Sequence, residues 1–123
     1  MACRLTELVL DARDPEALAR FWCEVLGWVE LDREGPDVIE VGAAPGALPT
    51  LVISRTADLR RGKLPLHLDV NPTDRDQAAE LERLLALGAR PVEIGQSGDE
   101  QWHVLADPEG NEFCLLRSRV DPQ

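Results

Sequence analysis

Two ionisable side chains, Glu7 and His67, occupy matching positions in two similar stretches of the chain. Residues 7–30 read ELVLDARDPEALARFWCEVLGWVE, and residues 67–93 read HLDVNPTDRDQAAELERLLALGARPVE. Each stretch runs from an apolar segment through an Asp- and Pro-containing turn to an amphipathic segment that ends in Leu-Gly. A repeat of about 60 residues is too long for a solenoid unit and suits two packed modules. Paired modules create a cleft, so we expect Glu7 and His67 to converge on it.

A carboxylate beside an imidazole can carry out acid–base chemistry. A Glu buried unpaired in an apolar strand is costly, so Glu7 must face a wet cavity or pair with a cation. His67 is a suitable partner, and Glu7 would orient its ring and stabilise its charged form. We therefore predict His67 as a catalytic acid or base with Glu7 as its catalytic partner. A metal-free pair is the favoured interpretation, and a shared metal ion is the alternative.

The elements that position these residues follow from hydrophobic spacing. The first module, about residues 4–55, is predicted to order one strand, one helix and three strands, at residues 5–12, 15–26, 29–31, 38–41 and 50–54. The first strand is predicted to be buried on both faces, where a charged residue such as Glu7 is unusual. Asp14 and Pro15 form a helix start, and Gly27 ends the helix.

The second module, about residues 64–118, repeats this order after a polar linker at residues 55–63. Its predicted strands lie at residues 66–70, 91–94, 101–105 and 112–117. Thr73 with Asp76 resembles a capping box, and Gly88 ends the helix. The stripe expected to be buried is Ala78, Leu81, Leu84 and Leu85. Residues 107–110, Asp-Pro-Glu-Gly, predict a type I turn between the last two strands.

Composition sets the broad class of the protein. A chain of 123 residues with 44% hydrophobic and 29% charged residues predicts one globular domain over residues 1–123. The net charge of −10 argues against nucleic-acid binding and slightly favours a cationic ligand. No long apolar run indicates a membrane span or a signal peptide. Three cysteines without CxxC spacing predict reduced thiols and a cytoplasmic location.

Two motifs carry a family resemblance. DPEALARFWCEVLG in the first module and DPEGNEFC in the second, in this order, resemble the vicinal oxygen chelate superfamily. The narrower resemblance is to its glyoxalase-like branch, which includes bleomycin-resistance-type binding proteins, and it covers about residues 4–118. It implies an α+β fold of two tandem βαβββ modules in one domain, with a curled mixed sheet around a cavity. It also implies a homodimer.

The resemblance further implies where a metal would be held. Glu7 and His67 fall on the opening ligand positions of the two modules. Cys114 falls where metal-binding members carry Glu, and Glu112 shares its strand parity. Residues 50–54 supply no ligand, so the set is incomplete. A divalent ion (Zn, Fe, Mn or Ni) remains possible, although a hard octahedral site would want more carboxylates.

Two functional classes follow. The first is a glyoxalase-like enzyme with lyase or isomerase chemistry on a small oxygenated molecule in the cavity between the modules. The second is a non-catalytic binder of the drug-resistance type. In either, Trp102 is predicted to face the ligand while His103 faces outward, with Cys114 and Glu112 as further ligand-binding candidates. An inert buried thiol is the default interpretation of Cys114.

Overall fold

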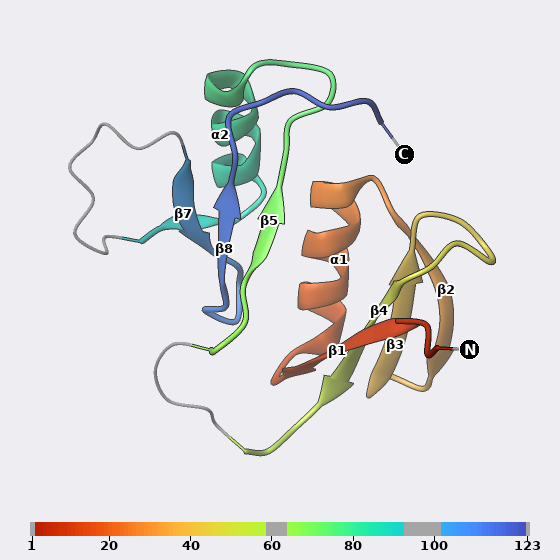
Figure 1. The fold of residues 1–123 in the computed structure, drawn as a ribbon. Helices are drawn as coiled ribbons and strands as arrows, with labels where there is room; N and C mark the ends of the chain where they lie inside the picture. Colours follow the sequence, from red (N-terminus) through yellow and green to blue (C-terminus); the bar gives the residue numbers. More distant parts are fainter. Residues whose placement is uncertain (1, 59–63, 93–101, 123) are drawn as a thin grey trace. The chain divides into compact units, whose positions relative to one another are not determined.

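The structure, a computed structural model, describes residues 2–58, 64–92 and 102–122. The chain forms two compact units, Met1–Arg60 and Arg61–Gln123, which we call module one and module two. Each contains one helix and one four-stranded sheet (Figure 1). The predicted α+β class and the order strand, helix, three strands in each module are confirmed. The predicted single domain and curled sheet stay predictions, because each module is described by itself.

Module one has the predicted elements: β1 (Glu7–Ala12), α1 (Pro15–Leu26), β2 (Val29–Glu34), β3 (Val38–Gly42) and β4 (Thr50–Arg55). The strand order is β1-β4-β3-β2, with β1 parallel to β4 and the other pairs antiparallel. Arg55, placed in the linker by the sequence, ends β4, and its Nε lies 2.7 Å from Asp37 Oδ1.

The start and end of α1 follow from three residues. The Asp14 side chain accepts a hydrogen bond from the Ala17 amide, and Pro15 occupies the first turn. Gly27 ends the helix with a φ of 67°, a left-handed conformation that favours glycine. The helix buries Leu18 and Trp22, which are 0% and 1% exposed. These local predictions are confirmed.

The expectation that β1 is buried on both faces is wrong. Val9 is 58% exposed, and Glu7 and Asp11 are exposed on the same face of the strand. Leu8 and Leu10 point the other way and are half-buried. The strand therefore has one exposed face, which carries Glu7, Val9 and Asp11, and one half-buried apolar face, rather than two buried faces.

Module two contains β5 (Leu68–Val70), α2 (Gln77–Ala86), β6 (Arg90–Pro91), β7 (His103–Ala106) and β8 (Glu112–Leu115). The strand order β5-β8-β7-β6 repeats that of module one, with β5 parallel to β8. Residues 93, 94 and 101, which the sequence assigns to strands, lie outside the described residues. The side chain of Gln77 donates to the Leu115 carbonyl at 3.3 Å and so ties α2 to β8.

The predicted start of α2 is wrong by one turn. Asp76, not Thr73, is the N-cap, and its side chain accepts from the Ala79 amide at 2.9 Å. Thr73 lies before the helix. Asp is at least as good a cap as Thr, and here it stands immediately before the helix.

The later start is accompanied by a different buried face. Leu84 is 0% exposed as expected, and Leu81 is half-buried, but Ala78 and Leu85 are exposed. Glu80 is 7% exposed instead, and its two carboxylate oxygens accept from the Arg83 guanidinium at 2.6 and 3.0 Å. A buried carboxylate is tolerated here because it is paired.

The predicted turn between β7 and β8 is confirmed. The Gly110 amide donates to the Asp107 carbonyl at 2.9 Å. Asp107 is 0% exposed, and its Oδ1 accepts from the amides of Glu109 and Asn111 at 2.9 and 3.0 Å. The turn therefore pairs Ala106 with Glu112 and sets the register of β8.

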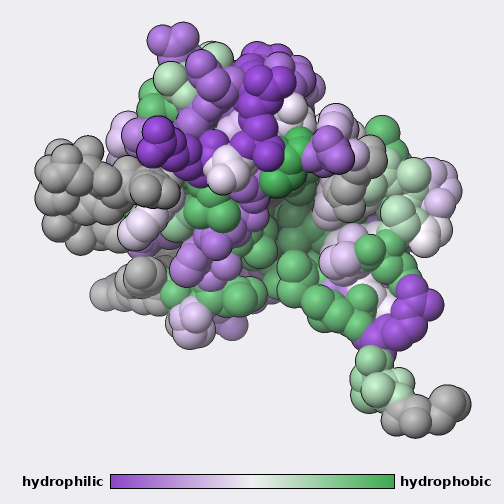
Figure 2. All heavy atoms as spheres, turned by 45° about the horizontal axis from the view of Figure 1, so that its top comes forward, coloured by the Kyte–Doolittle hydropathy of each residue, from purple (hydrophilic) through white to green (hydrophobic). Residues whose placement is uncertain are grey.

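Hydrophilic residues (purple) and hydrophobic residues (green) both appear on the face seen in Figure 2. No helix in the described part of the chain is both long and apolar enough to cross a membrane.

Candidate functional site

Strand alternation gathers chemically active side chains on one face of the module-two sheet. β8 lies between β5 and β7, so Cys114 is paired with Asp69 on one side and with Val104 on the other. Phe113 and Leu115, which point to the opposite face, are 1% and 0% exposed. Cys114 is thus flanked by a carboxylate on β5 and an apolar residue on β7.

This face is hollowed into a pocket of about 330 Å³. Its lining residues alternate along three segments of the chain and are His67, Asp69, Trp102, Val104, Glu112, Cys114 and Leu116. Trp102, Val104 and Leu116 make its apolar wall, and the other four provide polar groups. A concave site that combines an apolar wall with a few convergent polar groups is typical of small-molecule binding.

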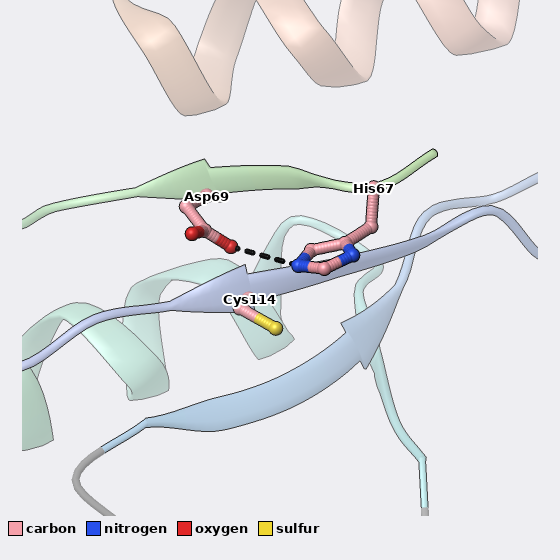
Figure 3. Close-up of side chains that lie close together, drawn as sticks. All are labelled: His67, Asp69 and Cys114. Atoms are coloured by element: carbon pink, nitrogen blue, oxygen red, sulfur yellow. Dashed lines mark ion pairs between the residues drawn. The ribbon is translucent and has the colours of Figure 1, made fainter. Parts of the chain in front are cut away.

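Three of the polar side chains point toward one another (Figure 3). His67 Nε2 lies 3.2 Å from Asp69 Oδ1, the geometry of an ion pair when the imidazole is protonated. A nitrogen of His67, a carboxylate oxygen of Asp69 and the Cys114 sulfur all lie within 4.8 Å of one another. Nitrogen, oxygen and sulfur donors so close together can hold a metal ion or meet the polar end of a ligand.

The cluster spans the depth of the pocket. The side chains of His67 and Asp69 are 49% and 47% exposed, whereas Cys114 is 9% exposed. The pair is thus open to solvent and the thiol is buried. Trp102 is 43% exposed, although most tryptophans are largely buried.

Glu112 adds a fourth polar group with an unusual feature. Its Oε2 atom is buried and has no hydrogen-bond partner among the described residues. The β5–β8 pairing of Leu68 with Phe113, continued by one residue, places His67 beside Glu112. A buried oxygen without a partner costs about 1–3 kcal/mol, so a donor or a cation at this point would relieve a real penalty.

The predicted site residues divide between the modules. His67, Trp102, Glu112 and Cys114 all line the module-two pocket, whereas His103 does not. Glu7 is the first residue of β1 in module one and is exposed. Its convergence with His67, and the roles assigned to all of these residues, stay predictions.

Asp69 is the residue that sequence reasoning missed. It stands two residues after His67 in the segment HLDV, and the extended backbone there turns both side chains to the same face. The same parity argument that linked Glu112 with Cys114 would have found it. The carboxylate that the structure places beside His67 is therefore Asp69.

Comparison with known proteins identifies the family. The sequence model of the family described as "Glyoxalase-like domain" matches residues 7–116. The chain belongs to this family. No curated protein matches the chain.

Solved structures share the fold of this glyoxalase-like domain at low sequence identity. A glyoxalase/bleomycin resistance protein/dioxygenase family enzyme from Burkholderia phytofirmans is 18% identical, with a TM-score of 0.69 over 92% of this chain and 97% of that one. The fosfomycin resistance protein FosX from Listeria monocytogenes, complexed with Mn(II) and a dihydroxypropylphosphonic acid, is 15% identical, with a TM-score of 0.71 over 98% and 93%. TioX from Micromonospora is 18% identical, with a TM-score of 0.59 over 94% and 98%.

The donor set of this glyoxalase-like domain does not suit the manganese ion seen in the FosX complex. Mn(II) prefers oxygen donors in octahedral geometry, whereas this cluster places the Cys114 sulfur beside one imidazole and one carboxylate. Sulfur and nitrogen donors suit zinc, and either a hydrogen-bond donor or a cation would satisfy the buried Glu112 oxygen. His67, Asp69 and Cys114 thus form a partial set of metal-binding donors whose sulfur and imidazole favour zinc over manganese.

Proposed function

We propose that the glyoxalase-like domain binds a small oxygenated molecule in the module-two pocket. One observation carries this proposal: a single pocket of about 330 Å³ has both an apolar wall and a cluster of polar side chains that point toward one another. Burial against the wall favours binding, and the polar groups set the orientation of the ligand.

The two ends of the pocket have separate tasks. The exposed ring of Trp102 offers a surface on which a planar or apolar group can stack. The oxygen of the ligand meets His67 and Asp69 at the polar end. Val104 on β7 and Leu116, one residue after β8, continue the apolar contact.

The catalytic form of this proposal is lyase or isomerase chemistry by proton transfer. His67 is the acid or base, because its exposed ring can reach a ligand while Asp69, 3.2 Å from Nε2, holds its orientation. Glu7 is retained as a second catalytic residue contributed by module one. The His67–Asp69 pair supports this form because it provides a proton carrier with its own positioning carboxylate.

A non-catalytic binder of the bleomycin-resistance type is the second candidate. The carboxylates of Asp69 and Glu112 on the pocket, together with the net charge of −10, favour a cationic drug-like ligand. A binder of this kind would use Trp102 and the two carboxylates to hold the ligand and would not convert it.

A fluorescence screen tests ligand binding. The purified chain is titrated with α-hydroxy-ketone, hemithioacetal, catechol-like and cationic drug-like compounds while tryptophan emission is followed. We expect saturable quenching that weakens about tenfold in Trp102→Ala and is largely retained in Trp102→Phe, since an aromatic ring still stacks. Equal affinities for the wild type and Trp102→Ala would contradict the assigned pocket.

A substitution of His67 separates the two classes. For a compound that is both bound and converted, His67→Ala should lose turnover by about 100-fold or more with binding largely retained. His103→Ala is the matched control, because His103 is the other histidine of the chain and does not line the pocket. Turnover that survives His67→Ala would remove His67 from the reaction, and saturable binding without turnover of any compound would favour the binder.

We also propose that the protein works as a homodimer in the cytoplasm. The family resemblance supports the dimer. Three free cysteines support a reducing compartment.

A further inference from the structure

We propose that Glu112 determines which molecules the module-two pocket accepts. It selects elongated ligands that carry an apolar ring at one end and a hydrogen-bond donor, a hydroxyl or a protonated amine, at the other. This inference rests on the proposed function, because it names the chemical class of the molecule bound there. The feature that leads to it is a buried acceptor on the pocket, Glu112 Oε2, to which no described residue donates.

The neighbours of Glu112 in the sheet explain why this oxygen has no donor. On β7 it is paired with Ala106, whose methyl group has no proton to donate. On the other side, the β5–β8 register continued by one residue places His67 beside it. His67, however, directs its Nε2 to Asp69 at 3.2 Å (Figure 3). Neither flanking side chain therefore satisfies the Glu112 oxygen.

Two other carboxylates of module two are buried, and both are paired within the chain. Glu80, 7% exposed, accepts from the Arg83 guanidinium at 2.6 and 3.0 Å. Asp107, 0% exposed, accepts from the Asn111 amide at 3.0 Å. Carboxylates that serve the fold are thus satisfied by the fold, as buried polar groups generally are. The contrast with Glu112 favours a partner that comes from outside the chain.

The chemistry of a carboxylate sets the class of that partner. A carboxylate accepts hydrogen bonds and donates none, so it favours a hydroxyl or an ammonium group over an ether. The last torsion of a glutamate side chain is broad, so the carboxylate of Glu112 can turn its buried oxygen toward a donor that enters the pocket. A site built around such an acceptor discriminates strongly against a molecule that lacks the donor.

Glu112 and Trp102 lie at opposite ends of the pocket. The antiparallel register of β7 and β8 pairs His103 with Leu115, and one step further it sets Trp102 beside Leu116. Four residues separate Leu116 from Glu112, a length of about 13 Å along an extended strand. A ligand that stacks on Trp102 and also reaches Glu112 is therefore elongated, with its ring and its donor at opposite ends.

Probes that differ in one hydrogen-bond donor test this selection on the wild-type chain. The full-length protein, labelled with nitrogen-15, is titrated with 4-phenylbutan-1-ol, 4-phenylbutylamine and 4-phenylbutyl methyl ether, and amide shifts give the dissociation constants. We expect the two donors to bind at least about tenfold more tightly than the ether. The tighter donor identifies whether a hydroxyl or an ammonium group is preferred. Equal affinity for all three probes would overturn the inference.

A variant of the same shape assigns the selection to Glu112. Glu112→Gln introduces an amide that can donate to the ether oxygen, so the ratio of alcohol to ether affinity should fall to about one to three. Glu82→Gln changes an exposed residue of α2 and should keep the wild-type ratio. Benzyl alcohol is the length control, because a ring stacked on Trp102 leaves its hydroxyl far from Glu112. A preference that persists in Glu112→Gln would overturn the role of this residue.

Thermal stability gives a readout that needs no ligand. Glu112→Met replaces an oxygen buried without a described partner by an apolar group, so it should raise the melting temperature by about 4 °C or more. Glu82→Met removes the same charge from an exposed position and should stay within about 2 °C of the wild type. A melting temperature of Glu112→Met at or below that of Glu82→Met would overturn the inference, since the fold would then depend on the carboxylate.

The outcomes separate this inference from the proposed function. If no probe, benzyl alcohol included, shifts the amides of the pocket residues, the proposed function is contradicted and this inference with it. If the probes bind in the pocket without preference for a donor, only this inference is overturned.

Discussion

Single residues in module two gain their chemical character from neighbours in the same segment and on adjacent strands. His67 is exposed, and its ring would be an ordinary surface imidazole without Asp69 at 3.2 Å. Cys114 becomes a candidate ligand because the sheet register sets it between Asp69 and Val104. Asp107 has a structural role instead. Its buried carboxylate holds the turn before β8, and this turn sets the register of the β8 side chains.

Asp107→Ala is expected to lower the free energy of unfolding by about 2–3 kcal/mol. The side chain is fully buried and accepts from the amides of Glu109 and Asn111 and from the Asn111 side chain at 2.9 to 3.0 Å. Removing it leaves three part-buried donors without their acceptor. Chemical denaturation measures the loss, with exposed Asp121→Ala as the control. Equal stability of the two variants would contradict the role of Asp107.

At the scale of helices and strands, the sequence predicts a helix boundary correctly where a single capping residue sets that boundary. Asp14 and Gly27 bound α1 as expected. In α2, Thr73 and Asp76 are both possible N-caps within four positions of the chain. The helix uses Asp76 rather than the capping box that begins at Thr73. The start of α2 therefore depends on which cap the packed helix can use.

The corrected cap makes a direct prediction. Asp76→Ala should lower the free energy of unfolding by about 1 kcal/mol, since the Ala79 amide loses its acceptor. Thr73→Ala is the matched control and should change it little, because Thr73 lies outside the helix. Thermal and urea unfolding of both variants measure the difference. A larger effect of Thr73→Ala would restore the capping box that the sequence suggested.

An exposed charge cluster links α1 to β2. Arg33 forms ion pairs with Glu16 on α1 and with Glu30 on its own strand. Residues three apart on a regular strand point to opposite faces, and the register shift between Glu30 and Asp32 brings these two to the same side. Hydrogen bonds from Arg33 lower the pKa of both carboxyls below their usual 4.5.

This cluster predicts a pH-dependent stability. Because the folded pKa values of Glu16 and Glu30 are lowered, their contribution is complete above pH 4.5 and is lost as the pH falls below it. Arg33→Gln should therefore melt slightly below the wild type at neutral pH, and the difference should disappear as the pH falls well below 4.5. Arg119→Gln serves as an exposed control. A difference that grows on acidification would contradict the sign.

At the scale of the whole molecule, two modules of the same strand order form the described chain. Family membership follows from a match over residues 7–116 and the fold from structures below 25% identity. The function therefore has to be argued from the module-two pocket, because one fold supports many activities.

The proposed homodimer is tested by light scattering on a sizing column. We expect a mass twice the 13.6 kDa of the chain at micromolar concentration. Exposed Cys3 could create a false dimer by oxidation, so Cys3→Ser with reductant is the control. A monomeric mass in that variant at all concentrations would contradict the dimer.

The sequence by itself determined the element order, the bounds of α1, the turn at residues 107–110 and the family. These features depend on neighbours a few residues apart, such as Asp14 with the Ala17 amide or Asp107 with Asn111. Parity along a strand also linked Glu112 with Cys114, and the same parity relates Asp69 to His67. The tertiary structure alone decided that β8 lies between β5 and β7 and so brings His67, Asp69 and Cys114 to one point. Strand pairing joins residues about 45 positions apart, and that contact is set by packing of the whole module rather than by any local pattern.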